Sequence, residues 1–298
     1  MHTFTKLQGL GNDFILFDNI GFSADHQNVT SPQMAVALCD RRFGIGADGL
    51  FVLRVAKDQV QADLSWEFYN ADGSMAEMCG NAIRCVGRYI FDKGLWPLSE
   101  DAERKRGSKD GRSDASDVQQ YEELRIETLA GIKAIGLELD DEGAPTGFRV
   151  DMGIAELDSN VEIEGRSYSR VSMGNPHAVT FVDDLLPEFG SAPVATEGPL
   201  VEIDPVFPNK TNVEFARVEN RELIHMRVWE RGVGETLACA TGACATAVVA
   251  KQKDLADDKV TVMLAGGPLK IEITKDLRVH MTGPAELVYT GIIMRSIF

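Results

Sequence analysis

The stretch 69–80, YNADGSMAEMCG, can be laid without a gap on the stretch 229–240, WERGVGETLACA. Each stretch ends one residue after a cysteine, so Cys79 and Cys239 lie at matching positions 160 residues apart. After each cysteine the chain continues with small or apolar residues at helical spacing, which predicts a helix. The sequence therefore places a thiol at the head of a helix twice.

A second motif repeats at nearly the same offset. The Gly-Asn pair that ends at Asn12 matches the pair that ends at Asn175, 163 residues later. Two motifs in the same order at similar offsets indicate an internal duplication, with two domains related by a pseudo-twofold axis. The offset is far longer than the roughly 20–50 residues of solenoid repeats.

The length of 298 residues also favours two domains. Segment 99–120 is almost entirely polar or charged. It cannot bury enough apolar area to offset its ordering entropy, so we interpret it as a flexible insertion near the domain boundary. We expect an N-terminal domain over 1–124 and a C-terminal domain over 125–282.

The composition excludes several classes of protein. A net charge of −16 argues against nucleic acid or an anionic membrane surface as a partner. No run approaches the roughly 18 apolar residues of a membrane span, and the N-terminus does not resemble a signal peptide. We expect a cytoplasmic protein. Five cysteines are an odd number at low density, which argues against a disulfide scaffold.

Alternating Val, Ile, Phe and Tyr residues predict short strands along both halves of the chain. A helix is expected at 31–40, where Ser31 and Pro32 supply an N-cap and a first-turn proline. Two more helices are expected after the two cysteine motifs. The predicted strands cover 13–17, 49–55, 64–69, 124–128, 148–152, 178–182, 211–217, 223–229, 260–263 and 269–274.

A cysteine at a helix N-terminus has a distinctive chemistry. The helix dipole and the nearby N–H groups stabilise a thiolate and should lower the pKa of the thiol from about 8.5. The N–H groups of 80–81 and 240–241 could hold one carboxylate between them. A duplicated pair of thiols could face one carbon from opposite sides. One sulfur would remove a proton and the other would return a proton, which inverts a stereocentre.

Other interpretations of the cysteines are weaker. The remaining three, Cys39, Cys85 and Cys244, fit small buried hydrophobes. The spacings Cys-x5-Cys and Cys-x4-Cys, without Cys-x2-Cys or a His cluster, give poor support for a metal site, and none is expected. A disulfide between Cys79 and Cys239 could form in oxidised protein, as a result of their proximity rather than as a function.

Several long motifs resemble the diaminopimelate epimerase family. The resemblance runs from residue 4 to residue 293 apart from the insertion, with the motifs in the family's order. They are GLGNDFILFDN, FYNADGSMAEMCGNAIRC, IETLAGIKA, GNPHAV, TNVEF, WERGVGETLACATGACA and GPAELVYTG.

The resemblance implies a cofactor-independent epimerase, which converts LL-diaminopimelate to the meso form in lysine and peptidoglycan biosynthesis without pyridoxal phosphate. It implies an α+β fold of two pseudo-symmetric domains, each with antiparallel strands wrapped around a central helix. It also implies a diamino-acid substrate and commonly a homodimer, with 283–298 returning to the N-terminal domain.

The resemblance also assigns roles to individual residues. Cys79 and Cys239 match the catalytic thiols, described in the family as proton donor and acceptor. His177 and Glu230 match positions thought to tune the thiol pKa values, and Glu230 with Arg231 reads the distal ammonium and carboxylate. The substrate-binding positions are Asn12, Asn70, Gly80, Asn81, Asn175, Asn212, Glu230, Arg231, Ala240 and Thr241.

Two positions depart from the family pattern. Gly49 stands where many members carry a substrate-contacting Gln, so we leave it out of the site. Ala240 stands where Gly usually follows the second cysteine. Its N–H is retained, but its Cβ requires a permissive φ. We expect modest effects on substrate fit.

Four alternatives stand beside this interpretation. Proline and hydroxyproline racemases share the two-thiol arrangement, but usually carry His at the position of Asn81 and have no use for Glu230 and Arg231. A catalytically silent protein would bind diamino acids without exchanging the α-proton. A pyridoxal-phosphate racemase would show itself in an absorbance spectrum. Isomerases of the phenazine-biosynthesis type generally lack the cysteine pair.

Overall fold

The computed structural model describes residues 2–20, 31–97, 122–185 and 190–294. The chain divides into two compact units, Met1–Val150 with Pro284–Phe298, and Asp151–Gly283. The C-terminal residues join the first unit, but the boundary after residue 124 expected from the sequence is not the one observed. Residues 124–150 form strands that continue the first unit's sheet. The expected insertion, 99–120, lies outside the described residues.

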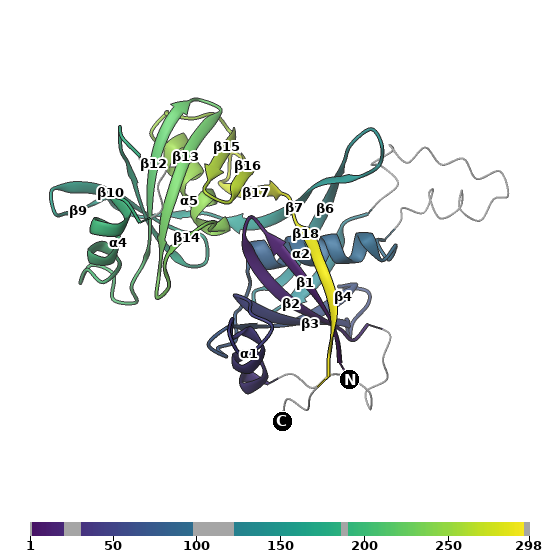
Figure 1. The fold of residues 1–298 in the computed structure, drawn as a ribbon. Helices are drawn as coiled ribbons and strands as arrows, with labels where there is room; N and C mark the ends of the chain where they lie inside the picture. Colours follow the sequence, from purple (N-terminus) through teal and green to yellow (C-terminus); the bar gives the residue numbers. More distant parts are fainter. Residues whose placement is uncertain (1, 21–30, 98–121, 186–189, 295–298) are drawn as a thin grey trace. The chain divides into compact units, whose positions relative to one another are not determined.

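In its described residues, the first unit is a mixed sheet with the helices α1 and α2 (Figure 1). The last strand, β18, pairs with the first, β1. In chain order its elements are β1 (His2–Gly9), β2 (Asn12–Asp18), α1 (Pro32–Cys39), β3 (Gly49–Val55), β4 (Leu64–Asn70), α2 (Gly80–Asp92), β5 (Leu124–Thr128), β6 (Gly131–Leu139), the first part of β7 (Pro145–Ile154), and β18 (Glu286–Ile293).

The second unit repeats this plan with a few short additional strands. In chain order its elements are the end of β7, β8 (Glu156–Leu157), β9 (Val161–Ile163), β10 (Arg166–Ser172), β11 (Pro176–Phe181), α4 (Val194–Glu202), β12 (Asn212–Asn220), β13 (Leu223–Glu230), β14 (Gly234–Thr236), α5 (Ala240–Gln252), β15 (Lys259–Leu264), β16 (Gly267–Ile273) and β17 (Arg278–Gly283).

Strand pairing confirms the duplication. In the first unit β2 is parallel to β3, β3 is antiparallel to β4, and β4 is parallel to β5. In the second unit β11, β12, β13 and β15 pair in the same way. The register agrees with the offset of 163, because Phe14 pairs with Gly49 as His177 pairs with Asn212. The parallel pairs are a detail that the sequence did not predict.

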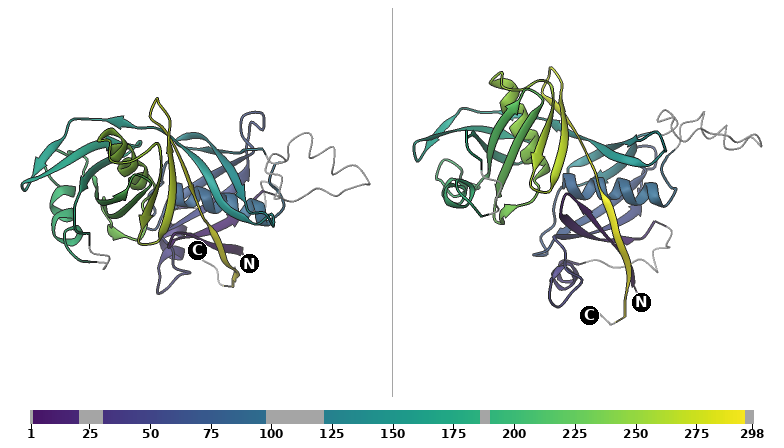
Figure 2. Two further views of the ribbon diagram at one scale, coloured as in Figure 1. Left: turned by 90° about the horizontal axis from the view of Figure 1, so that it is seen from above. Right: turned by 45° about the horizontal axis from the view of Figure 1, so that its top comes forward.

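Each unit wraps its strands around one helix. Helix α2 contacts β1, β2, β6 and β18, and α5 contacts β10 to β13 and β15 to β17. The two views of Figure 2 show α5 enclosed by the green and yellow strands of its unit. Ala243, Ala245 and Ala247 of α5 are fully buried, since small side chains let strands approach a helix on every side. The predicted α+β fold with a central helix in each domain is confirmed.

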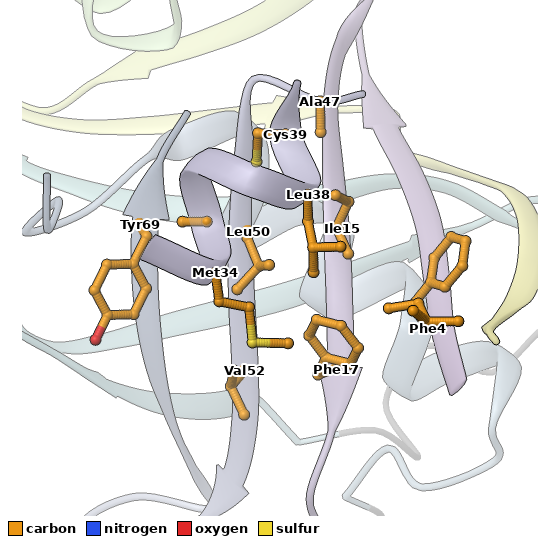
Figure 3. Close-up of a cluster of buried hydrophobic side chains, with 12 residues drawn as sticks. Phe4, Ile15, Phe17, Met34, Leu38, Cys39, Ala47, Leu50, Val52 and Tyr69 are labelled. Carbon is orange, nitrogen blue, oxygen red and sulfur yellow. The ribbon is translucent and has the colours of Figure 1, made fainter. Parts of the chain in front are cut away.

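A second helix covers the opposite face of each sheet. Ser31 caps α1 by accepting a hydrogen bond from the N–H of Met34, as its sequence predicts. Met34 and Leu38 of α1 pack on Ile15 and Leu50 (Figure 3). In the second unit Val194 and Val201 of α4 pack on the strands in the same way. Alternate residues of β2 and β3 therefore face α1 and α2.

All ten predicted strands coincide with strands of the structure. The sequence did not predict β6, β8, β9, β10, β14, β17, β18 or helix α4. Within the described ranges, no helix combines the length and the apolar character needed to cross a membrane.

Candidate functional site

The two cysteines occupy the same structural position in their units. Cys79 is the N-cap of α2 and has an extended backbone, with φ −137° and ψ 119°. Cys239 is the N-cap of α5, with φ −122° and ψ 109°. The first turn of a helix leaves N–H groups without a partner inside the helix. Each thiol therefore stands at the positive end of a central helix.

Two asparagines surround the first thiol. The Cys79 sulfur lies 4.0 Å from Oδ1 of Asn12, the first residue of β2. The same oxygen accepts a hydrogen bond from Nδ2 of Asn81 at 3.1 Å. The Asn12 Nδ2 donates to Asp48 Oδ2 at 2.6 Å, which fixes the amide with its oxygen toward the sulfur. Cys79 is half-buried, while Asn81 is buried.

Asn70 lies at the end of β4, opposite Gly49 in β3. Its side chain donates to the Ser74 hydroxyl at 2.9 Å. A Cβ on Gly49 would lie 2.7 Å from the Phe68 ring and 2.9 Å from the Tyr69 carbonyl oxygen. Since Phe68 fills this space, position 49 cannot carry a long side chain without repacking. This agrees with leaving Gly49 out of the site.

A chain of hydrogen bonds leads to the second thiol. The Cys239 sulfur lies 3.5 Å from the Thr241 hydroxyl, which accepts a hydrogen bond from Asn175 Nδ2 at 3.3 Å. Asn175 Oδ1 lies 3.0 Å from Nε2 of His177. The other ring nitrogen, Nδ1, lies 2.6 Å from Oε1 of Glu214. The side chains of His177 and Glu214 are completely inaccessible to solvent.

Residues at and after the end of β13 also lie near the Cys239 thiol. Glu230 accepts hydrogen bonds from the Thr236 hydroxyl and from Cys239. Asn212 Oδ1 accepts from the backbone N–H of Arg231 at 3.0 Å, so it supports the turn that follows Glu230. The Arg231 side chain is exposed and donates to the Asn209 carbonyl oxygen at 3.2 Å.

The pKa of Cys239 differs from the sequence-based expectation. Burial raises this pKa well above the ordinary value, and the Glu230 and Glu214 carboxylates raise it further. The Thr241 hydroxyl and the Gly242 N–H act in the opposite direction but do not compensate. The expected lowering at a helix N-terminus was therefore wrong for this thiol, because desolvation outweighs the helix end. Burial also raises the pKa of Glu230, against hydrogen bonds from Thr236 and Cys239.

The other cysteines are structural. Cys39, Cys85 and Cys244 are free thiols and are buried. Burial raises the pKa of Cys39 to about 12 and that of Cys85 further still. In the described part of the chain, no cluster of three or more His, Cys, Asp or Glu side chains could hold a metal ion.

The structure gathers the predicted residues into one group per unit. The first group holds Cys79, Gly80, Asn81 and Asn12, with Asn70 at a neighbouring strand end. The second holds Cys239, Ala240, Thr241, Asn175, His177 and Glu230, with Asn212 and Arg231 at adjoining strand ends. Ala240 is not among the described residues with positive φ, so its Cβ is accommodated.

Sequence reasoning missed Asp48 and Glu214. Both hold site residues through hydrogen bonds, Asp48 through Asn12 and Glu214 through His177. A signal was available for Glu214, because it is an acidic residue between Val213 and Phe215 in a buried strand. For Asp48, the Asp in a Gly-rich turn gave no such indication.

A family model described as diaminopimelate epimerase matches residues 4–157 and 169–288. The chain belongs to the diaminopimelate epimerase family. Curated diaminopimelate epimerases are similar to this chain over almost their whole length. The chain is 43% identical to the one from Moorella thermoacetica over 309 aligned residues, covering 98% of both chains. It is 42% identical to the one from Pelotomaculum thermopropionicum, again with 98% coverage of both.

Solved structures outside the diaminopimelate epimerase family share the fold. A probable proline racemase from Agrobacterium radiobacter superposes with a TM-score of 0.70 at 14% identity, covering 100% of this chain and 94% of that one. A hydroxyproline epimerase from Agrobacterium vitis gives a TM-score of 0.67 at 14% identity, with 97% and 91% coverage. At such low identity the likeness concerns the fold alone. The function of a diaminopimelate epimerase, an isomerase acting on an amino acid, follows from the curated relatives.

Proposed function

We propose that this diaminopimelate epimerase inverts one α-carbon of LL-diaminopimelate by transferring protons with Cys79 and Cys239, without pyridoxal phosphate or a metal. One observation carries the proposal. In each of two units with the same topology, a cysteine is the N-cap of the central helix. A duplicated fold that keeps a thiol at this position twice fits a reaction that needs one acid–base group on each face of a carbon.

The proton transfers balance without a further reactant. A thiolate takes the α-proton and becomes a thiol, and the electron pair remains on the α-carbon and its carboxylate. The opposite thiol then donates its proton to the other face and becomes a thiolate. Cys79 acts as donor and Cys239 as acceptor in one direction, and the roles exchange in reverse. Burial that raises the pKa of Cys239 also makes its thiolate a stronger base once formed.

The helix N-termini have a role in the same step. The N–H groups of Gly80, Asn81, Ala240 and Thr241 bind the carboxylate next to the reacting carbon. The positive ends of the two helix dipoles favour the charge that moves onto this carboxylate in the transition state. The side chains of Asn12, Asn70, Asn175 and Asn212 hold the zwitterionic substrate, since an amide both donates and accepts.

The remaining residues serve recognition and control of the thiols. Glu230 and Arg231 bind the ammonium and carboxylate of the distal amino-acid group, which a proline-type substrate lacks. His177 and Glu230 tune the pKa of Cys239, and Glu230 is already hydrogen-bonded to that thiol. The resemblance to the family alone supports a cytoplasmic homodimer that supplies lysine and peptidoglycan biosynthesis.

An NMR assay of LL-diaminopimelate in D2O tests the proposal. The wild-type enzyme, with reducing agent and no pyridoxal phosphate, should form the meso isomer and incorporate deuterium at the α-carbon. Cys79→Ala and Cys239→Ala should each lose epimerisation. Cys85→Ala and Cys244→Ala are matched controls, since they lie on the same two helices and should retain it.

Each contrary result has a distinct meaning. Tight binding without exchange in the wild type would point to a silent binding protein. Full activity in Cys79→Ala or Cys239→Ala would refute the two-thiol mechanism. Proline turnover in place of diaminopimelate turnover would assign the chain to the racemase alternative.

A further inference from the structure

The buried side chains on two equivalent pairs of strands differ between the two units. In the first unit Phe14 and Phe51 lie on neighbouring strands, fully buried, with ring centroids 6.2 Å apart. Their counterparts at the offset of 163 are His177 and Glu214, on the equivalent strands. The same position in the fold therefore holds an aromatic pair in one unit and an ionisable pair in the other.

The ionisable pair is costly to bury. Glu214 Oε1 contacts His177, but Oε2 has no hydrogen-bond partner among the described residues. A buried carboxylate oxygen without a partner loses its hydration and gains no hydrogen bond in return, which destabilises the folded protein. The Phe14–Phe51 pair shows that the fold can fill this layer with apolar side chains instead. We therefore expect the Glu214 carboxylate to have a role other than stabilising the fold.

A chain of hydrogen bonds joins Glu214 to the sulfur. As the amide is oriented, Nε2 of His177 donates to the Asn175 oxygen, and Nδ1 shares a hydrogen bond with Glu214. Asn175 then donates to the Thr241 hydroxyl. This hydroxyl lies 3.5 Å from the Cys239 sulfur, and either atom can be the donor. Because the bond from Asn175 occupies a lone pair of the hydroxyl, the hydroxyl proton can point at the sulfur. Hydrogen bonds in such a chain polarise one another.

A glycine in the first turn of α5, Gly242, leaves room for the Glu214 carboxylate beside the helix. A Cβ on Gly242 would lie 2.7 Å from Glu214 Oε1 and 3.3 Å from the Cys239 sulfur. The first turn of α5 therefore lies directly on the carboxylate and beside the thiol. In the first unit the sulfur faces the acceptor Asn12 Oδ1 at 4.0 Å. The second sulfur also has an acceptor beside it, Glu230, and in addition lies 3.5 Å from the Thr241 hydroxyl.

We propose that Glu214 is a positioning residue: through His177 and Asn175 it holds the Thr241 hydroxyl as a donor toward the Cys239 sulfur. The inference rests on the proposed function, because it concerns how that thiol carries a proton. Glu214 touches neither sulfur nor substrate. It acts by fixing the His177 ring, which in turn fixes the Asn175 amide.

The first test compares Glu214→Gln with Glu197→Gln. Glu197 is a matched control, since it is another hydrogen-bonded carboxylate of the second unit, held by Arg166 and Tyr168 away from this chain. In Glu214→Gln, kcat/KM for diaminopimelate epimerisation should fall at least tenfold. In Glu197→Gln it should stay within twofold of wild type, whatever each substitution does to the melting temperature.

A double variant separates positioning from stability. His177→Phe with Glu214→Leu installs an apolar pair like that of the first unit and removes both members of the buried polar pair. It should fold, because replacing both partners of a buried polar pair can be nearly neutral. Peptide mapping after iodoacetamide treatment at pH 8 should show alkylation of Cys239 slowed at least threefold relative to Cys79. Loss of the ordered Thr241 donor should outweigh loss of the Glu214 carboxylate, which by itself raises the pKa of Cys239.

Two results would overturn the inference. One is a kcat/KM of Glu214→Gln within twofold of wild type. The other is an unchanged ratio of Cys239 to Cys79 alkylation in the folded double variant. The alkylation ratio does not depend on turnover. A wild-type protein without epimerase activity would therefore defeat the proposed function while leaving Glu214's effect on the thiol measurable.

Discussion

The side chain of Asn12 is held by Asp48, whose Oδ2 accepts its Nδ2 hydrogen bond at 2.6 Å. Because this bond turns Oδ1 of Asn12 toward Cys79, Asp48→Ala should lower kcat/KM about tenfold, equivalent to about 1.4 kcal/mol. Steady-state kinetics check this. Asp58→Ala, which removes another turn-forming Asp of the same unit, is the control and should keep normal kinetics. Equal kinetics for both variants would remove Asp48 from the site.

Asp13 should make stability depend on pH at the acid end. Burial raises its pKa, but hydrogen bonds from Arg41 and Lys6 outweigh burial and bring it to about 2, below the ordinary 3.8. A folded pKa below the unfolded one gives stability that is fully present above pH 3.8 and is lost as pH falls through 2. The size is about 2 kcal/mol.

Urea unfolding of wild type and Asp13→Asn at several pH values measures this contribution. The difference in unfolding free energy between them should be largest near neutral pH and should shrink between pH 4 and pH 2. A difference that stays constant over this range would show that the charge of Asp13 contributes nothing.

The five thiols should differ sharply in reactivity. In native protein at pH 8, Cys39, Cys85 and Cys244 should resist iodoacetamide, since all three are buried and burial raises the pKa of Cys39 to about 12. Half-buried Cys79 should react first. Peptide mass spectrometry gives the rate at each site, with protein unfolded in urea as the control in which all five react. Rapid native labelling of Cys39 would contradict the packing described around α1.

Gly49 should tolerate no side chain while Phe68 is present. A Cβ there would lie 2.7 Å from the Phe68 ring, so Gly49→Ala should destabilise the protein by about 1–3 kcal/mol. The double variant Gly49→Ala with Phe68→Leu should lose less than the sum of the two single variants, because the smaller side chain removes the clash. Chemical unfolding of all four proteins gives the coupling energy, and strict additivity would disprove the clash.

The repeat and the motif helices could be predicted because they depend on local pattern. Cys79 and Cys239 are each followed by a helix, and the strands with clear alternation are present. Local pattern does not show the surroundings of polar residues: Thr5 and Lys6 of β1 are polar, and both are buried. Lys6 is compensated by Asp13 at 2.7 Å, a contact that no local pattern reveals.

The site could be predicted only as far as residues that carry recognisable chemistry. The pKa of Cys239 was misjudged because desolvation depends on how completely the second unit encloses α5. Glu214 was passed over because its importance comes from His177 on a neighbouring strand, 37 positions away in sequence. Such partners become visible only when strand register is known.

The pairing of β1 with β18 has a consequence for the order in which the protein is made. Every strand of the second unit comes from one continuous stretch, so that unit can fold as soon as its last strand leaves the ribosome. In the first unit, β1 must wait for β18, because His2 pairs with Ile293 at opposite ends of the chain. The domain that is synthesised first is therefore completed last, and one edge of β1 stays unpaired throughout translation.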